Sequence, residues 1–277
     1  SIIPLMNTFR DNQDYEADMF VNNHEAKEIM DDNTLLVVVD TNKPSITQCE
    51  DLLYMAKMIV VLDHHRQGSD TIRNSVLSYI EPYASSASEM VAEILQYFTE
   101  GIRIRNVEAD SIYAGIMIDT DNFMQKTGVR TFEAAAFLRR CGADVTRVRK
   151  LFREDMNDYK ARGETIRNAE LFRGQFAISE CPSDYVDSPT VVGAQAANEL
   201  LNIVGVKASF VLTEYKGVIY ISARAIDEVN VQIIMERMGG GGHLNIAGCQ
   251  LENTSVEEGI IVLKRTLDKM IEEGEIS

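Results

Sequence analysis

The chain has 277 residues, enough for two domains that each bury a hydrophobic core. Its hydrophobic fraction of 45% and charged fraction of 25% are typical of a soluble globular protein and exclude a disordered or fibrous one. A net charge of −16 leaves room for only a local basic groove, so a long nucleic acid is not the expected partner. The acidity favours carboxylate metal ligands and a small anionic substrate.

The cysteines and the hydropathy exclude two further classes of protein. The four cysteines form no C-x-x-C pair, which predicts reduced thiols rather than a zinc finger: Cys49, Cys141, Cys181 and Cys249. No signal peptide is recognisable, and no apolar run approaches the roughly 18 residues of a membrane span. Because the chain begins at Ser1 without an initiator methionine, we interpret it as part of a longer polypeptide.

The first half alternates short apolar runs with helical patterns. Residues 35–40 and 59–63 are continuous apolar runs, which predict buried strands, and residues 46–58 between them have a helical pattern. This order is typical of a parallel crossover. A third apolar stretch, residues 112–118, predicts a helix that passes into a short strand ending at Asp119.

Further helices follow from capping and periodicity. Ser86 and Glu89 have the spacing of a capping box, and apolar residues then recur at helical intervals as far as Phe98. Other helices are predicted at residues 106–116, 131–141 and 144–170. The last of these is long and charged, and we expect it to contain the link between two domains.

The second half has a different texture. Two β-rich runs, residues 206–215 and 218–225, flank a Lys216-Gly217 turn and predict a hairpin. Helical patterns follow at residues 230–238 and 255–273. This order of strands and helices predicts a smaller α/β domain with a mixed or antiparallel sheet.

Acidic side chains end three of the predicted strands. Ligands of open parallel sheets bind beyond the carboxyl ends of the strands, so Asp40, Asp63 and Asp119 are expected to converge. His64 and His65 follow the second of them. Carboxylates with imidazole suit manganese or a similar octahedral ion, and a shared carboxylate can bridge two such ions. The alternative for each aspartate is a turn former or helix cap, and for the histidine pair a structural or surface role.

Four motifs, in this order, resemble those of the DHH phosphoesterases. Residues 61–66 (V-L-D-H-H-R) resemble the signature that names the family, and residues 38–41 and 117–121 resemble its other metal-binding aspartate motifs. Residues 239–243 (G-G-G-G-H), followed by Ala247-Gly248, resemble the glycine-rich motif of the DHH-associated C-terminal domain. The resemblance implies an α/β fold, with a parallel-sheet DHH domain over residues 1–165 and a DHH-associated substrate-binding domain over residues 171–277.

The resemblance also implies a role for each motif residue. Asp40 would bridge two manganese ions, and His64 and Asp119 would complete one of the two sites. Asp63 would orient a neighbouring histidine, and His65 would face the substrate phosphate. The nucleotide would be held by Ser222, Arg224, Gly239, Gly240, Gly241, Gly242 and His243. Glycines let backbone amides approach a phosphate or base closely, whereas the alternative for this run is a flexible linker.

Details around the aspartate motifs, residues 40–44 and 119–123, are similar to those of GdpP-type cyclic-di-AMP phosphodiesterases. The implied function is manganese-dependent hydrolysis of a cyclic dinucleotide to the linear 5′-phosphorylated form. The family's H-x-x-x-D-x-D motif is absent from this sequence, which predicts one manganese ion or none and impaired activity. Two alternatives stay open: a nano-RNA hydrolase or single-strand exonuclease of the same family, and a non-catalytic nucleotide-binding module.

The resemblance extends to location and partners. It implies a membrane-anchored parent protein, with this chain on the cytoplasmic face. The expected partners are a small nucleotide substrate and, for oligomeric assembly, a second copy of the chain. The base of the nucleotide is not determined by these motifs.

Overall fold

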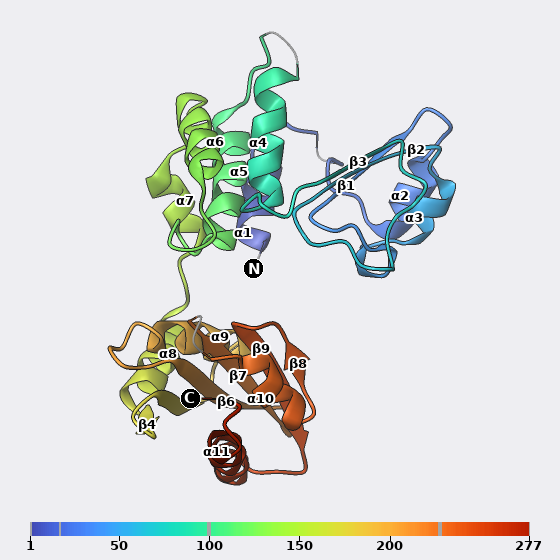
Figure 1. Ribbon diagram of the computed structural model, residues 1–277. Helices are drawn as coiled ribbons and strands as arrows, with labels where there is room; N and C mark the ends of the chain where they lie inside the picture. The colour runs from blue at the N-terminus through green and yellow to red at the C-terminus, as the bar shows by residue number, and fades with distance from the viewer. Residues whose placement is uncertain (1, 17, 99–100, 227–228, 277) are drawn as a thin grey trace. The chain divides into compact units, whose positions relative to one another are not determined.

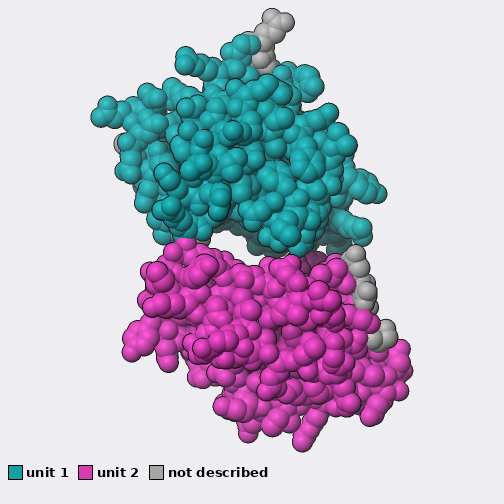
Figure 2. All heavy atoms as spheres, turned by 90° about the vertical axis from the view of Figure 1, so that its left-hand side faces the viewer, with its two compact units in different colours: residues 1–153 teal, residues 154–277 magenta. Residues whose placement is uncertain are grey.

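A computed structural model describes residues 2–16, 18–98, 101–226 and 229–276. The chain divides into two compact units, Ser1–Arg153 and Glu154–Ser277, which Figure 2 shows in separate colours. The first contains a parallel sheet and the second a mixed sheet, so the predicted α/β fold class is confirmed.

The sheet of the first unit has three parallel strands in the order β1-β2-β3 (Figure 1). They are β1 (Leu35–Val39), β2 (Met58–Asp63) and β3 (Leu77–Ile80). The predicted helix between the first two strands is wrong in extent, because only a 3-10 turn (Pro44–Ile46) and the short helix α3 (Asp51–Met55) form there. The Thr47 hydroxyl donates to the Pro44 carbonyl at 2.6 Å, a local hydrogen bond of the kind that competes with helix formation.

One face of this sheet is buried at β1 and the other is open. Alternate residues of β1 and β2 pack with Leu53 and Ile72 into a small core that contains Ile59 and Val61. On the opposite face of β1 the apolar side chains of Leu35, Val37 and Val39 are 52%, 48% and 49% exposed. Parallel sheets are usually covered on both faces, so this face is unusual.

Helices form the rest of the first unit. Figure 1 shows α4 to α7 gathered on one side and the sheet, with α2 and α3, on the other. Their bounds are α1 (Ile3–Arg10), α2 (Asn23–Ile29), α4 (Ala87–Tyr97), α5 (Asn106–Asp119), α6 (Val129–Arg140) and α7 (Val145–Leu151). The predicted start of α4 is confirmed, since the Ser86 hydroxyl caps it by accepting from the Glu89 backbone N–H at 3.0 Å.

Two of the predicted elements differ from the structure. The stretch that we expected to pass into a strand stays helical, and α5 continues to Asp119 because Ala109, Tyr113 and Ile116 recur at helical spacing in a buried core. The long helix predicted over residues 144–170 is interrupted after α7, and α8 begins at Met156. Asp155 caps α8 through its side chain, which accepts from the Asn157 N–H at 2.7 Å.

The second unit is built on a six-stranded sheet in the order β4-β5-β6-β7-β9-β8. Only β5 and β6 are parallel, so the predicted mixed sheet is confirmed. The predicted hairpin is also confirmed: Lys216 and Gly217 have φ of 53° and 77°, as a two-residue turn between twisted strands requires. The strands are β4 (Glu170–Phe172), β5 (Phe176–Cys181), β6 (Ala208–Tyr215), β7 (Val218–Ala225), β8 (Gly241–Gly242) and β9 (Ile246–Glu252).

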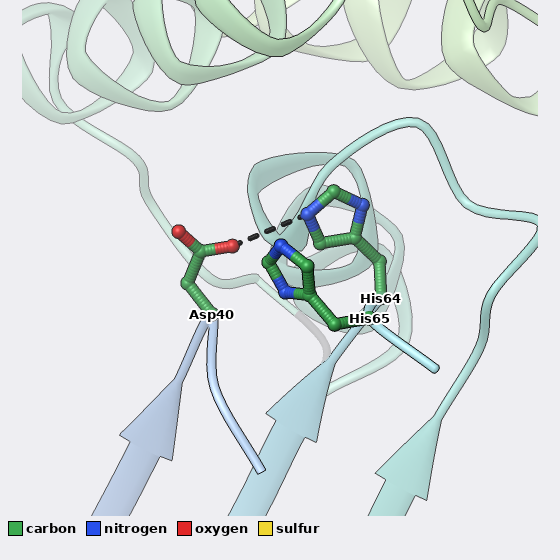
Figure 3. A group of neighbouring side chains, drawn as sticks. All are labelled: Asp40, His64 and His65. Atoms are coloured by element: carbon green, nitrogen blue, oxygen red, sulfur yellow. Dashed lines mark ion pairs between the residues drawn. The ribbon is translucent and has the colours of Figure 1, made fainter. Parts of the chain in front are cut away.

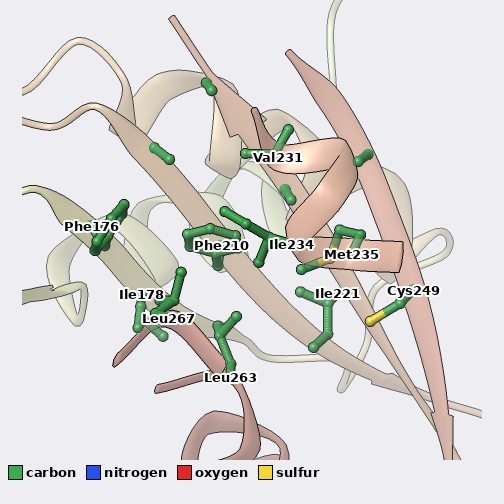
Figure 4. Packing of buried hydrophobic residues seen from close by; sticks show 14 of the residues in the cluster. Phe176, Ile178, Phe210, Ile221, Val231, Ile234, Met235, Cys249, Leu263 and Leu267 are labelled. Atoms are coloured by element: carbon green, nitrogen blue, oxygen red, sulfur yellow. The ribbon is translucent and has the colours of Figure 1, made fainter. Parts of the chain in front are cut away.

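Helices cover both faces of this sheet. On one face, α10 (Val231–Arg237) and α11 (Val256–Glu272) contribute to the core that Figure 4 shows, which includes Phe176 and Phe210. On the other face, α8 (Met156–Arg167) and α9 (Pro189–Leu200) share a smaller core with β5 and β6. Along β7 the residues Ile219, Ile221 and Ala223 enter the larger core. The alternate residues of β7 therefore face the α9 side.

Two further observations concern the cysteines and the membrane. All four cysteines are free thiols, and Cys181 and Cys249 are buried. Among the helices formed by the described residues, none combines the length and the apolarity that crossing a bilayer requires.

Candidate active site

The first cluster of candidate site residues lies at the carboxyl ends of β1 and β2. Asp40 follows β1, Asp63 ends β2, and His64 and His65 come next. The backbone N–H of Asp40 still donates to the Leu62 carbonyl at 3.0 Å, yet its φ of 65° is left-handed, so the chain turns sharply at this residue. Aspartate tolerates this conformation better than most residues, and strained backbone tends to occur at functional sites.

His64 is in contact with two carboxylates. Its Nε2 atom is 3.3 Å from Asp40 Oδ1 and 3.8 Å from Asp119 Oδ2. Figure 3 shows the rings of His64 and His65 beside the Asp40 carboxylate, and the ligand atoms of these three residues lie within 4.8 Å of one another. Asp119 arrives from the end of α5 rather than from a strand, so its predicted element was wrong although its side chain reaches the cluster.

These separations fit a shared metal ion. Ligands about 2.1 Å from an octahedral ion are about 3 Å apart when adjacent and about 4.2 Å apart when opposite. The distances of His64 Nε2 from Asp40 and from Asp119 fall within that range. The Ala84 backbone carbonyl also accepts a hydrogen bond from the His64 ring. A second hydrogen bond of this kind fixes the ring orientation of metal-binding histidines.

The electrostatics of the cluster favour a cation. The hydrogen bond to His64 lowers the pKa of Asp40, and the same bond, aided by Asp119, raises the pKa of His64. Burial, and then the charge of Asp40, raises the pKa of Asp119. A divalent ion beside the neutral His64 ring would stabilise both of these carboxylates in their charged form.

The Asp63 carboxylate contacts His65 and does not face outward from the cluster. Its side chain is fully buried, and Oδ1 lies 2.7 Å from His65 Nδ1 and 3.1 Å from the His65 backbone nitrogen. This is the contact that the resemblance implies for an orienting residue. Asn42 donates to Asp63 Oδ2 at 2.5 Å, and the sequence predicted no such contact for it beyond its place in the family-like segment 40–44.

The second group of candidate residues is in the other unit, around β7. A cavity of about 430 Å³ is lined by Ser222, Gly239 and Gly240, and by Gly248, which the glycine-rich motif also contains. Its remaining lining residues were not predicted: Thr190, Tyr220, Ile221, Cys249 and Gln250. Residues two apart on a strand point to the same face, so the prediction of Ser222 on β7 would also have indicated Tyr220. No sequence signal would have indicated Thr190, at the start of α9.

The glycine run packs tightly against β9 and is not a flexible linker. A Cβ atom on Gly240 would lie 2.1 Å from the Gly248 carbonyl oxygen, and one on Gly242 would lie 2.5 Å from Ala247 Cα. Gly241 and Gly242 form the edge strand β8. Neither of them lines the cavity, and nor does His243, which is exposed.

Arg224 lies outside the cavity lining and has no acidic partner among the described residues. Its Nε donates to Asn198 Oδ1 at 2.9 Å and another guanidinium nitrogen donates to the Ala223 carbonyl at 2.9 Å. Burial lowers the pKa of Arg224. A partly buried cation without a counter-ion, in a chain of net charge −16, indicates a place where an anion would bind favourably.

Comparison with known families identifies the class of protein. Residues 1–116 match the DHH family, N-terminal domain, and residues 175–273 match the DHHA1 domain. The chain therefore belongs to the DHH family and carries a DHHA1 domain, as its motifs predicted.

Individual relatives narrow the class. The chain is 44% identical, over 92% of its length, to the cyclic-di-AMP phosphodiesterase GdpP of Bacillus subtilis (strain 168). It is 42% identical, over 84% of its length, to the cyclic-di-AMP phosphodiesterase PdeA of Listeria monocytogenes serotype 1/2a (strain 10403S). It spans 39% and 36% of these two relatives.

A solved structure supports the fold. An exopolyphosphatase-related protein from Bacteroides fragilis superposes with a TM-score of 0.79 at 21% identity, covering 96% of this chain and 80% of that one.

Proposed function

We propose that the chain is the catalytic part of a manganese-dependent phosphodiesterase that hydrolyses cyclic-di-AMP to the linear 5′-phosphorylated dinucleotide. The observation that carries the proposal is the convergence of Asp40, His64 and Asp119 on one point at the edge of a parallel sheet. The names of the relatives at 44% and 42% identity support the substrate.

Asp40, His64 and Asp119 are the residues that would hold the ion. Oxygen ligands with one imidazole suit Mn²⁺ better than structural zinc. A bound divalent ion of this type lowers the pKa of water and offsets phosphate charge. We expect at most one ion per chain, because the one group of potential metal donors among the described residues is Asp40, His64 and His65. Asp119 adjoins this group through His64, at 3.8 Å from its Nε2 atom.

The remaining residues would bind and orient the nucleotide. His65, held at Nδ1 by Asp63, would turn Nε2 toward the substrate phosphate, and it would donate to a phosphate oxygen once Nε2 has taken up a proton. Ser222, Arg224 and the glycine run, including Gly240, offer hydroxyl, guanidinium and backbone donors to an anionic ligand. Hydrolysis adds water across one bond between phosphorus and O3′ and leaves a 5′ phosphate on the linear product.

Substitution of His64 tests the proposal. We expect His64→Ala to weaken Mn²⁺ binding at least about tenfold, as loss of ligand support does, and to abolish hydrolysis. Binding is measured by calorimetry and turnover by chromatography of the nucleotides. The matched control is His24→Ala, whose side chain is 81% exposed on α2. Unchanged Mn²⁺ binding by His64→Ala, or hydrolysis by the longer protein at an unchanged rate after this substitution, would end the proposal.

A comparison of substrates separates the alternatives. Cyclic-di-AMP and a short linear oligoribonucleotide are offered at equal concentration with Mn²⁺. Cleavage of the oligoribonucleotide alone would indicate a nano-RNA hydrolase or single-strand exonuclease. Nucleotide binding that needs no metal, without cleavage of either compound, would indicate a non-catalytic binding module.

We also propose that the chain works on the cytoplasmic face of a membrane as part of a longer, anchored protein, and that it can form a homodimer. The share of its relatives that it spans, 39% of one and 36% of the other, supports the longer protein. Cell fractionation with an antibody against the chain tests the location, and sedimentation velocity tests the dimer.

A further inference from the structure

Asn42 contacts both residues that determine the position of the His65 ring. Its side chain is 3% exposed, at the turn that follows β1. The amide nitrogen donates to Asp63 Oδ2 at 2.5 Å and to the His65 backbone carbonyl at 3.3 Å. The amide therefore bridges the carboxylate and the main chain of the histidine that this carboxylate holds.

The two oxygens of Asp63 serve different partners. Oδ2 accepts from Asn42, while Oδ1 accepts from the backbone N–H of His65 at 3.1 Å and lies 2.7 Å from His65 Nδ1. The terminal torsion of aspartate is broad, so one contact alone does not fix the plane of the carboxylate. With Asn42 on the other oxygen, rotation would break a hydrogen bond on each side.

We propose that Asn42 is a positioning residue that fixes the tautomer of His65. A carboxylate only accepts hydrogen bonds, so the contact with Asp63 Oδ1 requires the proton on Nδ1 and leaves the lone pair of the neutral ring on Nε2. Asn42 keeps Oδ1 aimed at the ring. The catalytic use of that lone pair rests on the proposed function, whereas the choice of tautomer does not.

Stability alone would not favour an asparagine at position 42. Its Oδ1 atom is buried and has no hydrogen-bond partner among the described residues. A buried acceptor left in this state costs stability, and most native side chains avoid it. The backbone of Asn42 has a separate structural part, because its carbonyl accepts from the Ile72 N–H at 2.9 Å, and any residue at this position can do that.

The test is the tautomer of His65 in the 277-residue chain without added metal or nucleotide. Side-chain nitrogen shifts from NMR distinguish a proton on Nδ1 from one on Nε2. Asn42→Leu removes the amide and keeps the number and branching of the heavy atoms of the side chain. We expect it to lower the ratio of the Nδ1–H to the Nε2–H form of His65 at least about fivefold, the equivalent of one hydrogen bond. His24 and His243 should not change.

A matched control removes an asparagine elsewhere in the same unit. Asn74 donates through its side chain to the Leu53 carbonyl at 2.9 Å and contacts no histidine in the described structure, so Asn74→Leu should leave the His65 tautomer unchanged. An unchanged His65 tautomer in folded Asn42→Leu would overturn the proposal.

A second pair of variants covers the case in which leucine is not accommodated. Asn42→Ser keeps a donor and should keep more of the Nδ1–H form than Asn42→Ala. Equal tautomer ratios in these two variants would also overturn the proposal. Unchanged Mn²⁺ binding by His64→Ala would refute the proposed function alone, because the NMR measurement requires neither metal nor turnover.

Discussion

Arg224, in the second unit, is a partly buried cation whose described surroundings do not balance its charge. Its hydrogen bonds go to an amide and a backbone carbonyl, and no described carboxylate pairs with it. Burying such a charge costs stability unless a ligand supplies the partner. We infer that Arg224 binds an anion. Loss of its charge should therefore weaken binding of the anion without lowering the stability of the fold.

Replacing Arg224 with methionine keeps most of the stem and removes the charge. We expect cyclic-di-AMP to bind roughly ten- to hundredfold more weakly, as loss of charge-assisted hydrogen bonds does. The free energy of unfolding should be unchanged or slightly higher. Calorimetry and chemical unfolding measure the two effects. The control is Arg173→Met, which removes an exposed arginine paired with Asp268 at 2.8 Å. Equal binding by both variants would exclude Arg224 from the site.

At the residue scale, the sequence predicted the contacts that follow from two strands lying side by side. Asp40 and His64 follow parallel strands, and the ends of such strands meet at one edge, so their contact was foreseeable. Asp119 reaches the same point from a helix, and only the packing of α5 brings it there. The contact of Asn42 with Asp63 was not predicted, because a hydrogen bond to a residue 21 positions away has no local signal.

At the scale of elements, the glycine run offers a comparison within one motif. A methyl group on Gly240 would collide with backbone atoms of β9, which cannot move aside as a flexible side chain would. A methyl group on Gly241 would meet nothing within 4 Å, and this residue has no positive φ. The two glycines therefore have different reasons to be glycine.

We expect Gly240→Ala to lower the free energy of unfolding by about 1–3 kcal/mol, the usual cost of overpacking. Gly241→Ala should change it by no more than about 0.5 kcal/mol. Chemical unfolding followed by circular dichroism measures both. If the two variants had equal stability, β8 would not pack against β9 as described. Because Gly240 also lines the cavity, the first variant should weaken nucleotide binding as well.

The elements predicted well are those with strong local signals. The capping serine of α4 and the turn between β6 and β7 determine their elements within a few residues. The strand β3 (Leu77–Ile80) has no such signal, since it exists through its pairing with β2. The interruption between α7 and α8 was missed because residues 152–155 contain neither glycine nor proline.

At the scale of the whole molecule, charge opposes compactness. The chain has 43 acidic and 27 basic residues, so some acidic side chains have other acidic side chains as neighbours. One such place is a cavity of about 540 Å³ in the second unit, lined by Glu164, Glu180 and Glu257 among others. Lys264, on the same cavity, is already paired with Glu170 at 2.9 Å.

Glu180 should report this repulsion through its dependence on pH. Burial, and then the charges of Glu257 and Glu214, raises the pKa of Glu180 above its usual value of 4.5. A raised carboxyl pKa means that the folded state binds the proton more tightly than the unfolded state. Ionised Glu180 therefore destabilises the fold at neutral pH, and this penalty fades as the pH falls through the raised pKa toward 4.5.

We therefore expect Glu180→Gln to stabilise the chain at pH 7.5 by a few tenths of a kcal/mol, roughly the size of an exposed charge interaction. The gain over the unsubstituted chain should shrink as the pH is lowered toward 5. Urea unfolding measures this gain in stability. The protein is kept dilute because its isoelectric point is near 4.7, and a low net charge promotes association. Glu252→Gln, at an exposed position on β9, is the control and should show no such trend. A gain from Glu180→Gln that is constant with pH would show that repulsion among these carboxylates is not its cause.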